Sequence, residues 1–151
     1  MNKDKNENEN KRIKMSSIQV PPLIRGNTVF SNIRWRIYDP TLTTLVYSDD
    51  NLGLINDPVL LERYMSQPLD LGHGNGIITI MYYDGKFYRD IKNYNGSELN
   101  NPYNLLGAIY THYHDKYPSV ATMINELNHK VAFIGLTELA NGIYRIDLIR
   151  E

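Results

Sequence analysis

The sequence predicts a single α+β domain, with a mainly antiparallel sheet of about six strands built from hairpins and about three helices. Three observations lead to this fold class. Runs of alternating apolar and polar residues occur in pairs around turn signals, which is typical of hairpins. Apolar stripes at helical spacing follow helix-start signals. Strands and helices do not alternate regularly, which argues against a parallel sheet with crossover helices.

The first hairpin is predicted from residues 28–38 and 43–48, joined by the turn residues Asp39-Pro40. Side chains alternate across a strand, so the first run has an apolar face and a polar, basic face. These two faces carry Val29, Ile33, Trp35 and Ile37 on one side and Asn32, Arg34, Arg36 and Tyr38 on the other.

A second hairpin is predicted around Asp84-Gly85, within residues 76–94. Asp-Gly between two strand-like runs favours a tight two-residue turn. This turn would set Tyr82 opposite Phe87, Ile80 opposite Arg89 and Ile78 opposite Ile91, and we expect that face to meet the core. The opposite face is expected to be wetter and carries Met81, Tyr83, Lys86, Tyr88, Asp90 and Lys92.

The helices are predicted at three places. Pro58 suits the first position of a short helix. Pro102 begins a second helix over residues 103–117, where apolar and tyrosine side chains recur at helical spacing, and Pro118 ends it. Ser119 caps a third helix.

A terminal hairpin is predicted after His129. Residues 130–139 and 143–150 are strand-like and flank Ala140-Asn141-Gly142, although residues 137–141 also have the character of a helical turn. Two helices followed by a hairpin have the element order of a winged helix. The second helix of that pair carries no Arg or Lys, so its charge argues against entry into a DNA groove.

Residues 1–15 are predicted to form a disordered polar tail, and residues 16–151 the domain. The first 14 residues carry five positive and three negative charges and are almost wholly polar. They cannot bury enough apolar surface to offset the entropy lost on folding.

The composition excludes several classes of protein. The chain has no cysteine, which excludes a disulfide scaffold, a cysteine nucleophile and a thiolate zinc site. Its net charge of -1 gives no general attraction for nucleic acid. No apolar run is long enough to span a membrane, and the N-terminus lacks the apolar core of a secretory signal. We therefore expect an intracellular (cytoplasmic) or virion-associated protein that is neither secreted nor bound to membranes.

The residue usage points to an AT-rich genome. The chain has 17 Asn, 16 Ile, 12 Tyr and 8 Lys, but only 4 Ala. The first four residue types have AT-rich codons and alanine has GC-rich ones. A phage, a large DNA virus or an AT-rich microbe would encode such a chain.

Two kinds of residue are candidates for metal chemistry, and no cofactor is predicted. The acidic loop of residues 47–57 fails the calcium-loop pattern, because counted from Asp49 its central glycine comes one position early and its last position is Leu60 instead of Glu.

The histidines are the other candidates. His112 and His114 stand close together in "YTHYHD", but on a helix they point about 200° apart and cannot hold one ion. On a strand they would share a face and still need a third ligand. His73 lies in the glycine-rich stretch "LGHGNG" (71–76), which has no strand before it and no helix after it, as a phosphate loop requires.

Basic and aromatic residues form the candidate interaction site. Such faces stack bases and hold phosphates, or contact proteins. The site residues expected from the sequence are Arg34, Trp35, Arg36, Tyr38, Tyr83, Lys86, Tyr88 and Lys92.

Three hypotheses follow from these observations. The first, which we prefer, is a non-catalytic structural or protein-interaction protein that binds a protein partner or associates with itself. The second is a nucleic-acid-binding accessory protein that uses the winged-helix order or the basic and aromatic strand faces. The third is a metal-dependent hydrolase. No convergent set of catalytic residues is visible, so we predict no catalytic residues and no metal ligands.

Overall fold

The computed structural model describes residues 22–30, 33–38, 46–49, 53–55, 58–71 and 76–151. The predicted fold class is confirmed: the chain is a single α+β domain with a mostly antiparallel sheet and three helices. The strands are β1 (Ile24–Arg25), β2 (Thr28–Val29), β3 (Ile33–Arg36), β4 (Val46–Asp49), β5 (Gly53–Ile55), β6 (Ile77–Tyr82), β7 (Asp90–Asn95), β8 (Val131–Ala140) and β9 (Ile143–Arg150). The helices are α2 (Pro58–Met65), α3 (Pro102–Lys116) and α4 (Val120–Glu126), with a 3-10 turn η2 (Gly96–Leu99).

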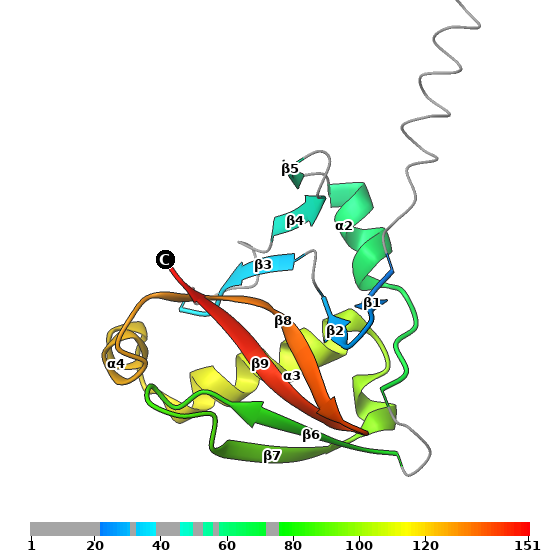
Figure 1. Cartoon of the computed structure of the whole chain (residues 1–151). Helices are drawn as coiled ribbons and strands as arrows, with labels where there is room; N and C mark the ends of the chain where they lie inside the picture. Colours follow the sequence, from blue (N-terminus) through cyan, green and yellow to red (C-terminus); the bar gives the residue numbers. More distant parts are fainter. Residues whose placement is uncertain (1–21, 31–32, 39–45, 50–52, 56–57, 72–75) are drawn as a thin grey trace, which may run out of the picture.

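Among the strands that the structure describes, one neighbouring pair on the main path of the sheet is parallel. Seven strands follow one another in the order β5-β4-β3-β8-β9-β6-β7. Off this path, β2 pairs with β8, and β1 pairs with β2. Every described pair is antiparallel except β6 with β9, which is parallel. The C-terminal strands β8 and β9 therefore lie in the middle of the sheet, and β7 forms one edge (Figure 1).

The predicted strand 28–38 is interrupted. Phe30 has a φ of 63°, which breaks the extended run into β2 and β3. Both pieces pair with β8, β2 through Val29 and β3 through Trp35. Gly135 on β8 lets this chain approach closely, because a Cβ there would lie 2.8 Å from the carbonyl oxygen of Val29.

The first hairpin is confirmed by the pairing of β3 with β4, with Ile33 opposite Tyr47. Its turn at residues 39–40 lies outside the described residues, as do the tail 1–15 and His73. The strand β5, which pairs with β4, was not predicted from the sequence.

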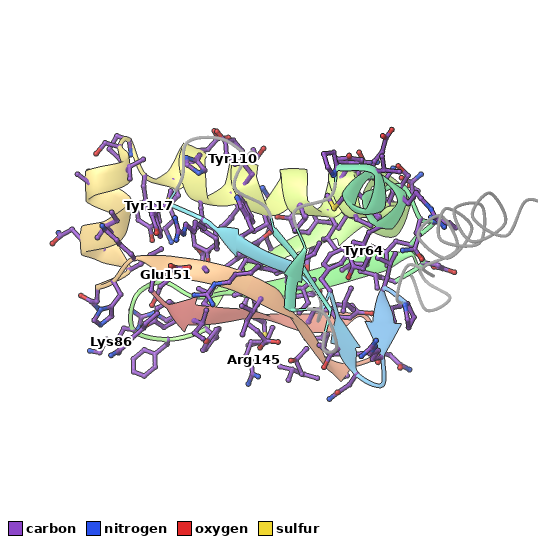
Figure 2. All side chains as sticks on the ribbon, turned by 90° about the horizontal axis from the view of Figure 1, so that it is seen from above. Tyr64, Lys86, Tyr110, Tyr117, Arg145 and Glu151 are labelled. Atoms are coloured by element: carbon purple, nitrogen blue, oxygen red, sulfur yellow. The ribbon has the colours of Figure 1, made fainter. Side chains whose placement is uncertain are left out.

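The described helices all lie on one side of the sheet (Figure 2). The apolar stripe of α3 packs against the sheet, and Leu106, Ile109 and Tyr113 are fully buried. Asn101 and Ser119 cap α3 and α4 with their side chains, so the predicted starts of both helices are confirmed to within a residue. The core between the two layers is rich in aromatic rings, with Trp35, Tyr82 and Phe133 among its largest members.

The predicted register of the second hairpin is wrong. Tyr82 pairs with Asp90, Ile80 with Lys92 and Ile78 with Tyr94, so the connection spans residues 83–89 instead of two residues. As a result, the helix-facing side of β7 carries Asp90, Lys92 and Tyr94. Phe87 and Ile91, which were expected to meet the core, are exposed.

Two contacts explain the longer connection. The Asp84 carboxylate accepts hydrogen bonds from the backbone N–H groups of Lys86 and Phe87, which fixes a turn around itself. Gly85, at a φ of +100°, packs against the backbone of Glu126 on α4, and a Cβ would lie 1.8 Å from that carbonyl oxygen. The loop is therefore shaped by its docking on α4.

The terminal hairpin is confirmed, with Asn141-Gly142 at its turn and Gly142 at a φ of +74°. It does not project as a wing. Because β3 flanks it on one side and β6 on the other, it is the centre of the sheet, and the element order of a winged helix here does not produce that shape.

Candidate functional site

The first candidate site is a cluster of polar side chains in which β7 and α3 meet. His112 Nε2 donates to a carboxylate oxygen of Asp90 at 3.0 Å, and Lys116 Nζ donates to the same oxygen at 2.6 Å. The imidazole ring of His112 stacks on the ring of Tyr82, with centroids 3.7 Å apart and planes at 11°. Residues one helical turn apart on α3 thus converge on one carboxylate of the edge strand.

The charges in this cluster are set by burial and by the shared carboxylate. Burial lowers the pKa of His112 below its usual value, although Asp90 opposes this effect, so the imidazole is neutral at pH 7. Burial acts to raise the pKa of Asp90, but the hydrogen bonds from Lys116 and His112 outweigh it and lower that pKa. A neutral imidazole therefore donates its Nε2 proton to an ionised carboxylate.

This cluster has limited access for a substrate. The side chain of His112 is only 10% exposed, and one ring face is covered by Tyr82. Beneath it, the hydroxyl oxygens of Tyr82 and Tyr94 lie 2.6 Å apart, and that of Tyr113 donates to the carbonyl oxygen of Tyr83. The polar groups of this cluster hydrogen-bond to one another, which is the arrangement expected of a structural contact between the sheet and the helix layer.

His114 points elsewhere. Its Nε2 atom lies 2.9 Å from the carbonyl oxygen of Ile37, next to β3, and its ring stacks on Tyr110. His112 and His114 thus contact strands on opposite sides of the central hairpin, as the predicted helix requires. Within the described residues, no three His, Asp or Glu side chains gather as a candidate metal site.

The outer face of the sheet, defined as the face turned away from α3, is the second candidate. The described helices leave it uncovered (Figure 2). Alternation along β6, β7 and β9 places several apolar side chains on this face, and each is substantially exposed: Ile77 (54%), Ile91 (59%), Ile143 (38%) and Ile149 (41%). These side chains extend over three adjacent strands. Met81 on β6, for example, lies opposite Ile91 on β7 and opposite Arg145 on β9.

The cations on and around this face are largely paired. Arg34 and Arg36 both contact the carboxylate of Glu151, at 3.1 and 3.4 Å. Arg145 contacts Asp147 at 3.3 Å, and Arg89 pairs with Asp84 in the loop beside the sheet. Backbone hydrogen bonds from Phe87 and Lys86, with the contact to Arg89, hold the pKa of Asp84 at about 2.

The structure places the four site residues expected near β3 in two layers. Arg34 and Arg36 lie on the outer face. Trp35 is 0% exposed and stacks on Tyr110 of α3, so it belongs to the core and cannot touch a partner. Tyr38 is half-buried, with the Lys130 ammonium over its ring.

The four expected residues near β7 are also divided. Tyr83 and Tyr88 pack on each other, and the Arg145 guanidinium lies over the Tyr88 ring. Lys86 is exposed at the loop, where Figure 2 shows it on the side away from α3. Lys92 faces the opposite way, toward the helix layer. Since β3 and β7 are separated by β8, β9 and β6, the two basic strand faces do not join.

Sequence reasoning missed the outer-face isoleucines and the cluster of Asp90 with His112. The available signal for the first was alternation in residues 143–150, where Ile143 and Ile149 share a parity with Arg145 and Asp147. The wrong register of the second hairpin hid Ile91 by assigning it to the core.

Comparison of the chain with protein-family models, with curated proteins and with solved structures gives no match. None of the helices in the described part of the chain has the length and apolar character needed to cross a membrane.

Proposed function

We propose that the chain is a non-catalytic protein-interaction protein that binds a folded partner through the outer face of its sheet. The observation that carries this proposal is the set of exposed isoleucines on β6, β7 and β9, on a face that the described helices leave open. Exposed apolar surface that extends over several strands marks interaction sites more often than apolar side chains that are exposed singly.

The mixture of residues on this face also resembles an interface. Apolar side chains stand beside Arg145, and Tyr88 lies at the margin with the Arg145 guanidinium over its ring. Arg and Tyr are enriched where proteins contact one another, because they combine a large contact area with hydrogen-bonding groups. Arg34 and Arg36 extend the polar rim toward β3.

Nucleic acid is the alternative partner, and the charges favour it less. Phosphate binding needs cations that are free to neutralise it. Arg34 and Arg36 share Glu151, and Arg145 is held by Asp147. The part of the chain that the structure describes therefore offers this face little uncompensated positive charge.

A double lysine variant distinguishes a protein partner from a nucleic-acid partner. Ile143→Lys with Ile149→Lys places two cations on the outer face. The matched control is Val59→Lys, at an exposed apolar position on α2. For the tagged protein expressed in its native cells, we expect the double variant to lose a co-purifying protein that the wild type and the control both retain.

DNA titrations at low and high salt provide the second readout. If the face binds nucleic acid, the added lysines strengthen a salt-sensitive interaction instead of abolishing binding. That result, or retention of the protein partner by the double variant, overturns the proposal. Circular dichroism of all the variants establishes that they are folded.

A further inference from the structure

The free edge of β7 and the groove beside it form a second surface, separate from the outer face. β7 is the last strand on its side of the sheet among the described residues, with α3 behind it (Figure 1). Between β7, η2 and α3 lies an open groove of about 420 Å³. Its walls include Lys92, Tyr94, Leu99, Tyr103, Gly107 and Ala108.

The hydrogen-bond pattern shows which backbone groups of β7 face outward. The Thr79 N–H donates to the carbonyl oxygen of Gly142, so Thr79 is turned toward β9. Backbone groups alternate along a strand, so Ile78 and Ile80 are turned toward β7, where Tyr94 and Lys92 lie opposite them. The N–H and C=O groups of Ile91 and Asn93 therefore point away from the sheet, where an added strand would bind them.

The side chains at the groove have a definite chemistry. Lys92 lies with its ammonium 5.3 Å from the centre of the Tyr94 ring, and among the described residues no carboxylate lies within ion-pair distance of it. Tyr94, Leu99 and Tyr103 give the groove an apolar part, beside the polar side chains of Glu98, Asn104 and Thr111. Gly107 leaves open space on the helix, since a Cβ there would meet no atom within 4 Å.

We propose that this groove binds an extended segment of a partner protein, which adds to the sheet as an antiparallel strand along β7. Main-chain hydrogen bonds to Ile91 and Asn93 hold the segment, and alternate side chains enter the groove. A carboxylate of the segment lies opposite Lys92, and an apolar side chain two residues before it lies opposite Tyr94.

The charges fix that order. Residues 92 and 94 become non-hydrogen-bonded positions for an added antiparallel strand, where facing side chains are closest. Glu98 lines the groove on η2, at the end of β7 that contains Tyr94. A carboxylate placed there would be repelled, whereas Lys92 would attract it. The apolar side chain therefore belongs at the η2 end of the groove.

The test uses a short acetylated, fluorescein-labelled peptide, with leucine two positions before glutamate and threonine elsewhere. A matched peptide has lysine in place of glutamate. We expect the full chain to bind the glutamate peptide saturably in fluorescence anisotropy. The Lys92→Glu variant should bind the glutamate peptide about tenfold more weakly than the wild type, because two carboxylates then repel each other. It should bind the lysine peptide more tightly than the wild type does, because the charges then attract.

A second variant blocks the groove without weakening the fold. Gly107→Leu should abolish binding, yet keep or raise thermal stability, because leucine forms helices better than glycine. Amide exchange measured by NMR should show new protection at Ile91 and Asn93 in the presence of saturating peptide.

Three results overturn this proposal: absence of saturable binding, unchanged exchange at those two amides, or equal binding by both variants and the wild type. Self-association that Gly107→Leu abolishes would also overturn it and assign the edge to a second copy of the chain. The outer-face variants on β9 leave β7 unchanged, so failure here is distinguishable from failure of the proposed function.

Discussion

His112 on α3 and Asp90 on β7 are joined by a 3.0 Å contact between Nε2 and a carboxylate oxygen, which ties the edge strand to the helix layer. Lys116 reinforces the link from the next turn of the helix. The pKa values of both His112 and Asp90 are lowered. In each case the folded chain holds its proton less tightly than the unfolded chain, so acid weakens the fold.

Acidification should therefore reduce stability in two separate ranges. The His112 contribution is complete above the ordinary value of 6.5 and is lost as the pH falls through the lowered pKa. The Asp90 contribution disappears only below its ordinary value of 3.8. Urea denaturation at about pH 7.5 and about pH 5.5 measures the contribution of His112 separately from that of Asp90. His112→Gln keeps a donor for Asp90 and should lose less stability between these two pH values than the wild type. Equal losses in the two proteins would contradict this origin of the pH dependence.

Gly85→Ala should destabilise the domain by about 2–4 kcal/mol, because it combines a positive φ with a clash against the backbone of α4. Gly107→Ala is the matched control. It adds a methyl group where there is open space on α3 and should stabilise the domain by about 0.5–1 kcal/mol. Urea denaturation of both variants measures the difference. A small cost at Gly85 would mean that the 83–89 loop does not depend on its docking against Glu126.

The pair Tyr82 and Tyr94 should respond asymmetrically to loss of a hydroxyl. Tyr82 is buried and Tyr94 is only partly buried. Tyr94→Phe leaves the Tyr82 hydroxyl buried without its partner and should cost about 1–3 kcal/mol. Tyr82→Phe leaves a hydroxyl that can reach water and should cost about 1 kcal/mol or less. Thermal denaturation of the two variants and the double variant checks this order, and the reverse order would rule out the argument.

Glu151→Gln should have a small effect on stability, at most about 1 kcal/mol, because the side chains of its two arginine partners are 42% and 54% exposed to solvent. The same change removes the acid that Arg34 and Arg36 share. We therefore expect weak salt-sensitive DNA binding to increase in this variant, as measured by fluorescence anisotropy. Unchanged DNA binding would mean that Glu151 does not limit the positive charge that Arg34 and Arg36 offer to DNA.

Local sequence signals predicted the positions of helices and hairpins better than they predicted which parts of the chain these elements pack against. The α3 helix follows from its apolar stripe and its proline boundaries, and the terminal hairpin from Asn141-Gly142. These signals are contained within a few residues, so no knowledge of the rest of the fold is needed. By the same reasoning, His112 and His114 were correctly expected to diverge.

The features that failed depend on distant contacts. The register of β7 differs from the predicted one because Asp84 fixes a turn around itself and Gly85 docks on Glu126, which lies far along the chain. Trp35 was placed on the right face of its strand, but its burial depends on α3 covering that face. Alternation in residues 143–150 indicates which side chains share a face. Joining that face to those of β6 and β7 requires the strand order and the parallel contact of β6 with β9.

The central position of β8 and β9 has a consequence for how this protein is made. Strands β3 and β6 are synthesised before their partners in the middle of the sheet and cannot meet across the gap. During translation they must wait until residues 131–150 have left the ribosome, exposing unpaired backbone in the meantime. Folding of the sheet should therefore be a late and concerted event, in which newly completed strands are inserted between older ones.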